Sequence, residues 1–552
     1  MIRPAQKNAA LTHDDPARWP LYTLLTMRGW RGQLLDIALG ALAVLGQAPF
    51  HFWAVMLVSL ALLKLRLDYM RYEGETPGRR AFYIAGRFGF GYFLFGLFWI
   101  GSAFIARGPA FVPLMPPMIV GLAVLLALFW AFAGYFYKGL KLGAFGSVVA
   151  FTALFTLAEM GRGHILSGLP WNLTGYIFPA GGPISQSAAF IGIYGLTCLV
   201  FLISAGLASV VLVRVKPRLI WGPVLACGML LGLFIGGSMR LSGAKTDYVD
   251  GVHLRIAQVP FNQRDKFDPQ KSVEIVNQFL EVSLRDGLDD ISHIIWPEGA
   301  VNGLVLRNRP LIASFGQALS VRTQDPPIWL LQTLRHEQSA VNGTDNAPPY
   351  SDEYYNSSAA ITFDRQGNAH LAAYSDKSKL VPFGEFIPGG KLADRLGFKT
   401  LSTVLASLTP AKHKENSDYP GLPRVSAQIC YEIIFSGLTP RSKTDPAHWI
   451  LNQSNDAWYG RSIGPHQHFN QARYRAIEEG VALIRAASNG ISGAVDSYGR
   501  VIKQAGADEK IALDVRLPKS MLPVVEIYHF SIFLLLINLF LSILYINVGK
   551  GY

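Results

Sequence analysis

Residues 112–135 read VPLMPPMIVGLAVLLALFWAFAGY, and this stretch contains no charged side chain. About 20 apolar residues are enough for a helix to cross the hydrocarbon core of a bilayer, so the stretch predicts a membrane span. Seven further apolar runs, some of them shorter, lie at Leu34–Phe50, Phe52–Leu65, Phe82–Ile105, Ala144–Leu157, Ser187–Leu212, Leu219–Gly237 and Phe530–Val548. The sequence therefore predicts a polytopic α-helical membrane bundle with eight spans.

The composition of the 552-residue chain agrees with such a bundle, since 50% of the residues are hydrophobic and only 16% are charged. Soluble globular proteins carry about 25% charged residues, which excludes a disordered chain and an ordinary cytosolic enzyme. The alternative is a soluble core of buried helices, but such a core would not place so many apolar runs back to back. The three cysteines exclude a disulfide-stapled scaffold, and no Cys or His cluster indicates a metal site.

Basic residues between the spans predict the orientation of the bundle. The N-terminal segment and every second loop hold 15 Lys and Arg residues, whereas the other short loops hold two, Arg107 and Arg162. The 15 are Arg3, Lys7, Arg18, Arg28, Arg31, Lys64, Arg66, Arg71, Arg79, Arg80, Lys138, Lys141, Arg214, Lys216 and Arg218. Because basic loops stay in the cytoplasm, the N-terminus is predicted to lie inside. The net charge of +12 is then a topology signal and does not indicate a nucleic-acid partner.

This topology divides the chain into four segments. Residues 1–31 are predicted to be cytoplasmic and lack the apolar core of a cleavable signal peptide, so the first span can serve as the targeting signal. Residues 32–238 are predicted to form spans one to seven, and residues 239–527 an extracytoplasmic domain. Residues 528–552 are predicted to form span eight and a cytoplasmic tail.

The extracytoplasmic segment is predicted to form an α/β domain, because short β-rich runs alternate with helical stretches. The predicted strands are His253–Val259, His293–Trp296, Ile328–Leu334, Ser358–Phe363, Leu371–Tyr374, Val425–Cys430, Trp449–Asn452, Ala482–Ala487 and Gly493–Asp496. The predicted helices are Pro269–Arg285, Arg309–Val321 and Pro465–Gly480.

Glu298 is the first candidate catalytic residue. The run Ile291–Trp296 is typical of a strand, and Pro297 cannot donate to a strand ladder, so Glu298 follows the strand end. Sites of α/β proteins are built at such ends, where a partly buried carboxylate can act as a general base. A turn carboxylate or a helix cap is the alternative interpretation.

Lys377 opens the segment KSKLVPFGE, which ends at Glu385. A lysine close to developing negative charge stabilises an oxyanion or lowers the pKa of a thiol. An ordinary solvated loop is the alternative interpretation.

Cys430 ends the predicted strand Val425–Cys430. Cys198 and Cys227 fall in predicted spans, so Cys430 is the only thiol of the extracytoplasmic domain and has no disulfide partner there. A thiolate at a strand end, beside a base and a cation, is a good acyl acceptor. Burial as a small hydrophobic residue is the alternative interpretation.

The stretch Asn452–Gly460, NQSNDAWYG, is predicted to be a polar loop after a strand. It can shape a pocket near the nucleophile, and an Asx-rich turn is an equally good interpretation. His466 and His468 lie two positions apart on a predicted helix and face different sides, so we interpret them as structural or solvated.

Four strings in this order resemble the apolipoprotein N-acyltransferase family, which is membrane-bound and part of the nitrilase superfamily. They are Trp-Pro-Glu at 296–298, Lys-x-x-Leu-Val-Pro-Phe-Gly-Glu at 377–385, Cys-Tyr-Glu at 430–432 and Ser-Asn-Asp-Ala-Trp at 454–458. A soluble domain between spans seven and eight is also similar to the layout of this family. The resemblance therefore covers nearly the whole chain.

The resemblance implies an α-β-β-α sandwich for the extracytoplasmic domain. It implies an enzyme of a bacterial inner membrane whose catalytic domain is periplasmic. The acyl donor would be a phospholipid, typically phosphatidylethanolamine, and the acceptor a lipoprotein whose N-terminal cysteine carries a diacylglyceryl group. No cofactor, metal or nucleic acid is implied.

Carried over by motif, the resemblance makes Glu298 the general base, Lys377 the electrostatic stabiliser and Cys430 the nucleophile that forms a thioester. The supporting positions are Asn356, Glu385, Tyr431, Glu432 and Trp458.

Two positions depart from the family pattern. Phe267 lies nine residues after Gln258, where the family usually has a Trp, and Gly299 with Ala300 replaces a common Ser-Ala. Both departures keep size or backbone freedom, so they concern substrate fit rather than chemistry. The stretch Phe386–Leu408, rich in Leu and Phe with Gly hinges, is expected to be a mobile arm that contacts lipid, with an ordinary core loop as the alternative.

Three other functions stay open. A membrane-tethered, nitrilase-type amidohydrolase would use the same triad with water as acceptor. A non-catalytic membrane receptor with a ligand-binding ectodomain would tolerate replacement of Glu298, Lys377 and Cys430. A transporter is poorly supported, because few charges such as Arg87 lie within the spans.

Overall fold

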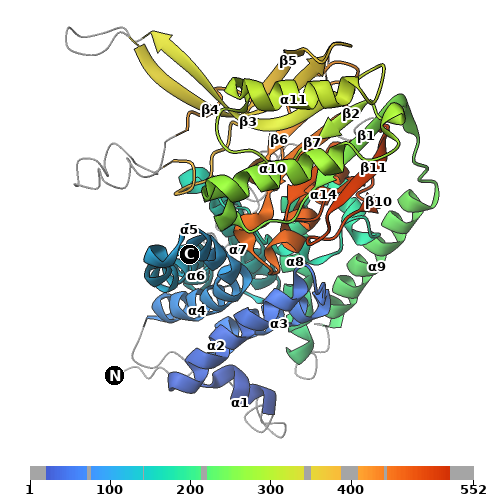
Figure 1. The fold of residues 1–552 in the computed structure, drawn as a ribbon. Helices are drawn as coiled ribbons and strands as arrows, with labels where there is room; N and C mark the ends of the chain where they lie inside the picture. The colour runs from blue at the N-terminus through green and yellow to red at the C-terminus, as the bar shows by residue number, and fades with distance from the viewer. Residues whose placement is uncertain are drawn as a thin grey trace, which may run out of the picture.

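The computed structural model describes residues 20–70, 76–140, 142–212, 220–340, 350–386, 408–440, 444 and 446–521. The N-terminal part is helical, and the C-terminal part contains two β-sheets with helices on their outer faces (Figure 1). The predicted span Phe530–Val548 lies outside the described residues, as does the predicted arm Phe386–Leu408 except for its two end residues.

The helical part begins with α1 (Pro20–Thr26) and ends with α9 (Trp221–Ser242). Between them lie α2 (Gly29–Ala43), α3 (Trp53–Tyr69), α4 (Pro77–Leu97), α5 (Gly101–Arg107), α6 (Met115–Gly139), α7 (Ala144–His164) and α8 (Ala188–Ala208). Helix α4 packs along α2 and α6, and α8 packs along α3, α7 and α9. The described part of the chain has five helical stretches long and apolar enough to cross a membrane, namely Pro77–Arg107, Pro109–Gly139, Ala144–Ser167, Ile184–Val211 and Trp221–Ser242.

Seven of the eight predicted spans fall within the described ranges, and five of these seven correspond to helices long and apolar enough to cross a membrane. The first two predicted spans form α2 with 15 residues and α3 with 17, about 22 and 26 Å at 1.5 Å per residue, which is short of a hydrocarbon core of about 30 Å. The predicted span Ala144–Leu157 is too short, because α7 continues to His164. Glu159 and Arg162 allow this continuation by forming a buried ion pair of 2.8 Å.

The first sheet has the strand order β11-β1-β2-β3-β4-β5. Its strands are β1 (Tyr248–Gln258), β2 (His293–Ile295), β3 (Ile328–Ala340), β4 (Tyr350–Phe363), β5 (Ala369–Asp376) and β11 (Ile511–Pro518). Helices α10 (Pro269–Ser283) and α11 (Arg309–Ser320) cover its outer face (Figure 1). Phe279 of α10 and Phe315 of α11 pack there on Trp296 and Trp329.

The second sheet has the order β10-β9-β8-β7-β6. Its strands are β6 (Val425–Ile429), β7 (Trp449–Asn455), β8 (Ala482–Ser488), β9 (Gly493–Val495) and β10 (Val501–Gln504). Its outer face carries α14 (Gly464–Glu479), and its inner face packs on the first sheet through residues such as Leu451 and Ile484. The predicted α/β sandwich is thus confirmed. The sequence prediction omits β10 and β11, whose short runs contain several charged or polar residues.

The direction of the strands places the candidate site residues at one edge of the sandwich. Strands β1, β2 and β3 are parallel, and so are β6, β7 and β8, so the carboxyl ends within each set share one edge. Gln453 of β7 joins the two sheets near this edge, since its Nε2 donates to the carbonyl of Trp296 at 2.8 Å. Residues that follow β2, β6 and β7 are thereby brought near one another.

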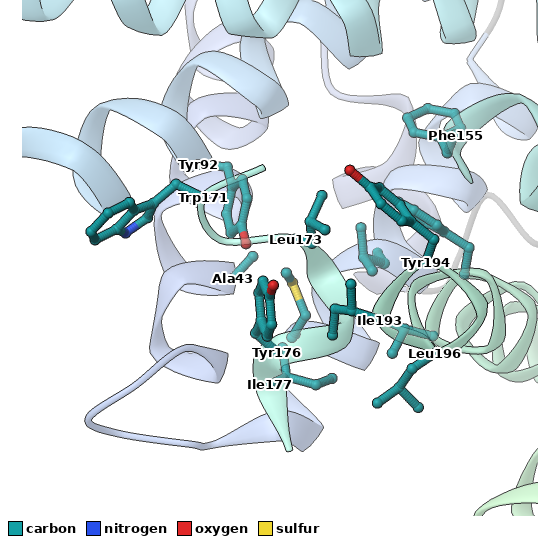
Figure 2. Close-up of a cluster of buried hydrophobic side chains, with 14 of the residues drawn as sticks. Ala43, Tyr92, Phe155, Trp171, Leu173, Tyr176, Ile177, Ile193, Tyr194 and Leu196 are labelled. Atoms are coloured by element: carbon teal, nitrogen blue, oxygen red, sulfur yellow. The ribbon is translucent and has the colours of Figure 1, made fainter. Parts of the chain in front are cut away.

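The sandwich and the helical bundle share a continuous apolar core. Helix α14 packs on α8, and Glu478 accepts a 2.6 Å hydrogen bond from the N–H of Ile193, where α8 is interrupted at Gly192 with a φ of 63°. Figure 2 shows the bundle side of this core, in which Leu173 and Tyr176 lie beside Ile193. The sheets are therefore fixed on the bundle by packing along α14.

Candidate active site

Glu298 lies in the turn that follows β2. Its Oε1 accepts a hydrogen bond from Nδ2 of Asn356 at 3.0 Å, and its Oε2 accepts one from the backbone N–H of Asn455 at 3.1 Å. The Nζ of Lys377 is 3.9 Å from Oε1. Residues of β4, β7 and the end of β5 thus orient the carboxylate together.

Lys377 follows β5 and is buried, with 1% of its side chain exposed. Its Nζ donates a 2.9 Å hydrogen bond to Oε1 of Glu385. Burial alone would lower the pKa of Lys377, but the carboxylates of Glu385 and Glu298 outweigh burial and raise it. The ammonium therefore stays charged between two acids.

Asn356 of β4 connects the same two acids. Its Nδ2 donates to Oε1 of Glu298 and to Oε1 of Glu385, at 3.0 Å in each case. Its Oδ1 accepts a 2.7 Å hydrogen bond from Nε2 of Gln332, so the amide nitrogen must face the carboxylates.

Cys430 directly follows β6 and begins the 3₁₀ helix η13 (Cys430–Ile434). Its φ is 50°, a left-handed conformation that is rare for a residue with a side chain and marks a strained turn. Burial and then Glu298 raise the pKa of the thiol to about 12, although Lys377 acts in the opposite direction. The thiol therefore keeps its proton near neutral pH, so attack by this sulfur requires a base.

Glu432 connects the turn of Cys430 to the loop of Lys377. Its Oε2 accepts from the N–H of Ile429 and from Nζ of Lys414, each at 2.9 Å. Its Oε1 accepts from the N–H and Oγ of Ser378, each at 2.8 Å. Burial would raise the pKa of Glu432, but Lys414 and the backbone N–H groups lower it below its usual value.

Tyr431, Trp458 and Phe267 lie outside this hydrogen-bonded group of acids. The hydroxyl of Tyr431 donates to the carbonyl of Gly168 at 2.7 Å and so contacts the bundle. The ring of Trp458 faces the guanidinium of Arg107 at 5.9 Å. Phe267 is 65% exposed, so the structure leaves it at the surface.

A buried ion-pair network after β7 was not foreseen from the sequence. Asp456 accepts from Nη2 of Arg485 at 2.7 Å and from Oγ of Ser454 at 2.6 Å, and it lies 3.0 Å from Nδ1 of His468. Burial would raise the pKa of Asp456, but Arg485 and His468 lower it. Asp456 and Ser454 lie in the string at 454–458, whereas His468 comes from α14 and Arg485 from β8. In the described ranges, no cluster of three His, Cys, Asp or Glu side chains is suited to a metal ion.

Lys266 is another buried lysine close to Glu298, and it was not selected from the sequence. It lies in the 3₁₀ helix η10 (Gln263–Phe267), and its Nζ is 5.7 Å from the centroid of the Phe261 ring. No hydrogen-bond acceptor for this ammonium is found among the described residues. Burial lowers the pKa of Lys266 to about 8, and Glu298 opposes this only in part. Gly299 leaves the necessary room, because a Cβ at this glycine would lie 2.6 Å from Nζ.

We expect Lys266→Met to raise the unfolding free energy at pH 7 by about 1–3 kcal/mol, because the cost of desolvating a largely buried ammonium is removed. The pKa of Lys266 is lowered on folding, so the penalty is full below pH 8 and fades as pH rises toward the unfolded value of about 10.4. Thermal unfolding in detergent at pH 7 and pH 10 measures this. Lys271→Met, at a lysine with 55% of its side chain exposed, is the control and should change little. A stability loss in Lys266→Met at pH 7 would contradict the expectation.

Comparisons with known proteins cover both parts of the chain. The family model of the apolipoprotein N-acyltransferase N-terminal domain matches residues 39–206, and that of carbon-nitrogen hydrolase matches residues 255–521. The first match falls on the helical bundle, and the second falls on the sandwich.

Several relatives align over nearly the full length. The apolipoprotein N-acyltransferases of Rhodopseudomonas palustris and Bradyrhizobium diazoefficiens are each 34% identical to this chain, over 90% of it and 91% of their own length. A solved structure, a mutant amidase of the nitrilase superfamily from Nesterenkonia AN1, is 14% identical with a TM-score of 0.33 and covers 50% of this chain and 94% of its own. From the full-length relatives, the chain belongs to the apolipoprotein N-acyltransferase family.

Proposed function

We propose that this protein transfers an acyl chain from a phospholipid to the N-terminal amine of lipoproteins that carry diacylglyceryl-cysteine. The observation that carries the proposal is the ammonium of Lys377 at 3.9 Å from the Glu298 carboxylate, with the charges of both acting on the buried thiol of Cys430. Acyl transfer needs a nucleophile, a base and a cation in this relation. The relatives are named for an apolipoprotein acceptor, which supports the same acceptor class here.

In the first half-reaction Cys430 attacks the ester carbonyl of the phospholipid. The thiol proton moves to Glu298 as the S–C bond forms, because the free thiolate is scarce at neutral pH. The hydrogen bonds from Asn356 and Asn455 hold the Glu298 carboxylate in one orientation for this transfer. The lysophospholipid oxygen then leaves and takes the proton from Glu298.

Negative charge on the carbonyl oxygen needs a fixed donor. The ammonium of Lys377 and the backbone N–H of Tyr431 take this role. One such donor contributes on the order of 100- to 1,000-fold in rate. Glu385 and Asn356 hold Lys377 and Glu298 in place, so the charges are arranged before the substrate arrives.

In the second half-reaction the lipoprotein amine attacks the thioester. Glu298 accepts a proton from the amine, the N–C bond forms, and the C–S bond breaks to release the thiolate. Splitting the transfer into two steps means that the two large substrates never have to bind together, which gives ping-pong kinetics.

We also propose a membrane topology for the four segments of the chain. Residues 1–31 and the end of segment 528–552 are cytoplasmic, residues 32–238 form the membrane bundle, and residues 239–527 are periplasmic. The five apolar helices and the basic loops support this arrangement in a bacterial inner membrane. Both substrates are lipids or lipid-anchored, so the site must open at the outer leaflet.

Phosphatidylethanolamine alone is expected to add one acyl chain to the purified protein, because the first half-reaction needs no amine. Intact-mass spectrometry measures the gain. Cys430→Ala should show none, whereas Cys227→Ala, at an exposed thiol on α9, should match the wild type.

Adding a diacylglyceryl lipopeptide should then remove the acyl mass from the protein and place it on the lipopeptide amine. Release of the chain as free fatty acid, even with lipopeptide present, would instead favour the amidohydrolase reading with water as acceptor. An equal mass gain on Cys430→Ala, or none on the wild type, would overturn the proposed function.

A further inference from the structure

Tyr459 brings a phenol hydroxyl to the sulfur of Cys430. The residue ends the 3₁₀ helix η14 (Asp456–Tyr459), and its hydroxyl oxygen is 3.9 Å from Sγ. A hydrogen bond to sulfur is longer than one to oxygen because the sulfur atom is larger. In the part of the chain that the structure describes, the Cys430 sulfur is the one hydrogen-bond partner found for this hydroxyl.

Aromatic neighbours hold the Tyr459 ring in place. Trp99 packs edge-on against it with ring centroids 4.5 Å apart, and Trp171 does so at 5.7 Å. The indole N–H groups of Trp99 and Trp171 both donate to Oε1 of Gln467, at 3.2 and 2.9 Å. The hydroxyl therefore points at the sulfur from a fixed ring.

Other groups also act on the Cys430 sulfur, and most of them have further partners. The charged ones are Glu298, Lys377 and Asp456, and Ser454 and His468 lie close by. Lys377 donates to Glu385, and the hydroxyl of Ser454 donates to Asp456. Burial, and then the charge of Cys430, raise the pKa of Tyr459 well above its usual value, so the phenol keeps its proton. Its hydrogen is therefore available to the sulfur, beside the hydroxyl of Ser454, which also lowers the thiol pKa.

We propose that Tyr459 is a further catalytic residue, whose hydroxyl donates a hydrogen bond to the sulfur of Cys430 whenever that sulfur carries negative charge. The inference rests on the proposed role of Cys430 as nucleophile. During attack the S–H proton goes to Glu298, the S–C bond forms, and the carbonyl electron pair moves to oxygen. During release the N–C bond forms and the C–S pair returns to sulfur. Tyr459 transfers no proton and stabilises the thiolate in both steps.

Alkylation of Cys430 by iodoacetamide at pH 8 tests the hydrogen bond without any lipid. The protein carries Cys198→Ala and Cys227→Ala, so one thiol remains. Tyr459→Phe keeps the ring and removes the donor, which should raise the thiol pKa by about one unit. The thiolate becomes tenfold scarcer but more nucleophilic, so alkylation should slow about three- to fourfold. Site-specific 3-fluorotyrosine at position 459, a stronger donor, should speed it up to about twofold.

The graded series separates a hydrogen-bonding role from a packing role, because fluorination changes donor strength and leaves the ring nearly unchanged. Tyr419→Phe is the matched control, since it removes a buried hydroxyl that donates to Ser358 in the core. It should alkylate at the wild-type rate. Equal rates for Tyr459→Phe and wild type, or no gain with fluorotyrosine, would overturn the inference.

The two proposals fail separately. If the alkylation series is graded but phosphatidylethanolamine adds no acyl mass to the wild type, the proposed function is wrong and the Tyr459 hydrogen bond stands. If acyl mass is gained and the series is flat, the role of Tyr459 alone is wrong.

Discussion

Lys377→Met is expected to lower the rate of acyl-enzyme formation by about 100- to 1,000-fold, because it removes the cation proposed to stabilise the oxyanion. The same change leaves Glu298 and Glu385 as two carboxylates, only 13% and 15% exposed, without the ammonium between them. Breaking a buried charge pair in this way costs about 3–5 kcal/mol, so stability should fall as well.

The two consequences of Lys377→Met are separated by two measurements. Intact mass after exposure to phosphatidylethanolamine reports the chemistry, and thermal unfolding in detergent reports stability. Lys379→Met is the matched control, because that side chain lies exposed two residues away and only approaches the Phe435 ring, at 5.7 Å. It should keep both the acyl mass and the unfolding temperature. A Lys377→Met protein that folds and is acylated at the wild-type rate would refute the assigned role.

Glu432→Ala is expected to lower the unfolding free energy by about 3–5 kcal/mol and to abolish acyl-enzyme formation. Its carboxylate holds the N–H of Ile429 before the nucleophile and the N–H of Ser378 after the lysine. Without it, the ammonium of Lys414, 5% exposed, loses its carboxylate partner, and the two loops lose their common anchor. Glu432→Gln keeps the shape and removes the charge, so its loss should be smaller.

The pH dependence of stability gives the second arm of this test. The pKa of Glu432 is lowered on folding, so its contribution is present above the unfolded pKa of about 4.3 and is lost as pH falls through the folded value. The stability difference between wild type and Glu432→Gln should therefore be largest near pH 7 and shrink in acid. Glu415→Ala, at an exposed neighbour, serves as control. A difference that is constant from pH 7 down to pH 3 would count against the ionised role of Glu432.

Much of the fold follows from local patterns. Runs of apolar residues predict the long helices α4, α6, α8 and α9, and β-rich runs bounded by Pro, Gly or Asn predict nine of the strands. Two of the seven predicted spans within the described ranges are too short, because run length was judged without tertiary partners. The buried pair of Glu159 and Arg162 prolongs α7, and α2 ends at Ala43, before the predicted end at Phe50. Helix α3 continues past Leu65 to Tyr69, yet its 17 residues remain short for a span.

Some residues of the candidate site can be selected from the sequence, and others are found only in the structure. Glu298, Lys377 and Cys430 can be selected from the sequence because each stands at a strand end with the right chemistry, and their catalytic roles stay predictions. The structure adds Lys266, Tyr459 and the partners of Asp456, which carry no sequence pattern of their own. Phe267 has a 65% exposed side chain, and its role as a supporting position stays a prediction.

The sequence by itself determined the membrane helices, the α/β sandwich and the chemical types at the strand ends, because hydrophobic run length and strand punctuation are properties of neighbouring residues. Only the tertiary structure decided which donors reach which acids and which hydroxyl reaches the thiol. Asn356 and Glu298 are 58 residues apart in the chain, Ser378 and Glu432 are 54 apart, and Cys430 and Tyr459 are 29 apart. Contacts at such separations are set by how the two sheets and the bundle pack, since a shift of one strand or one loop would exchange the partners while leaving every local pattern unchanged.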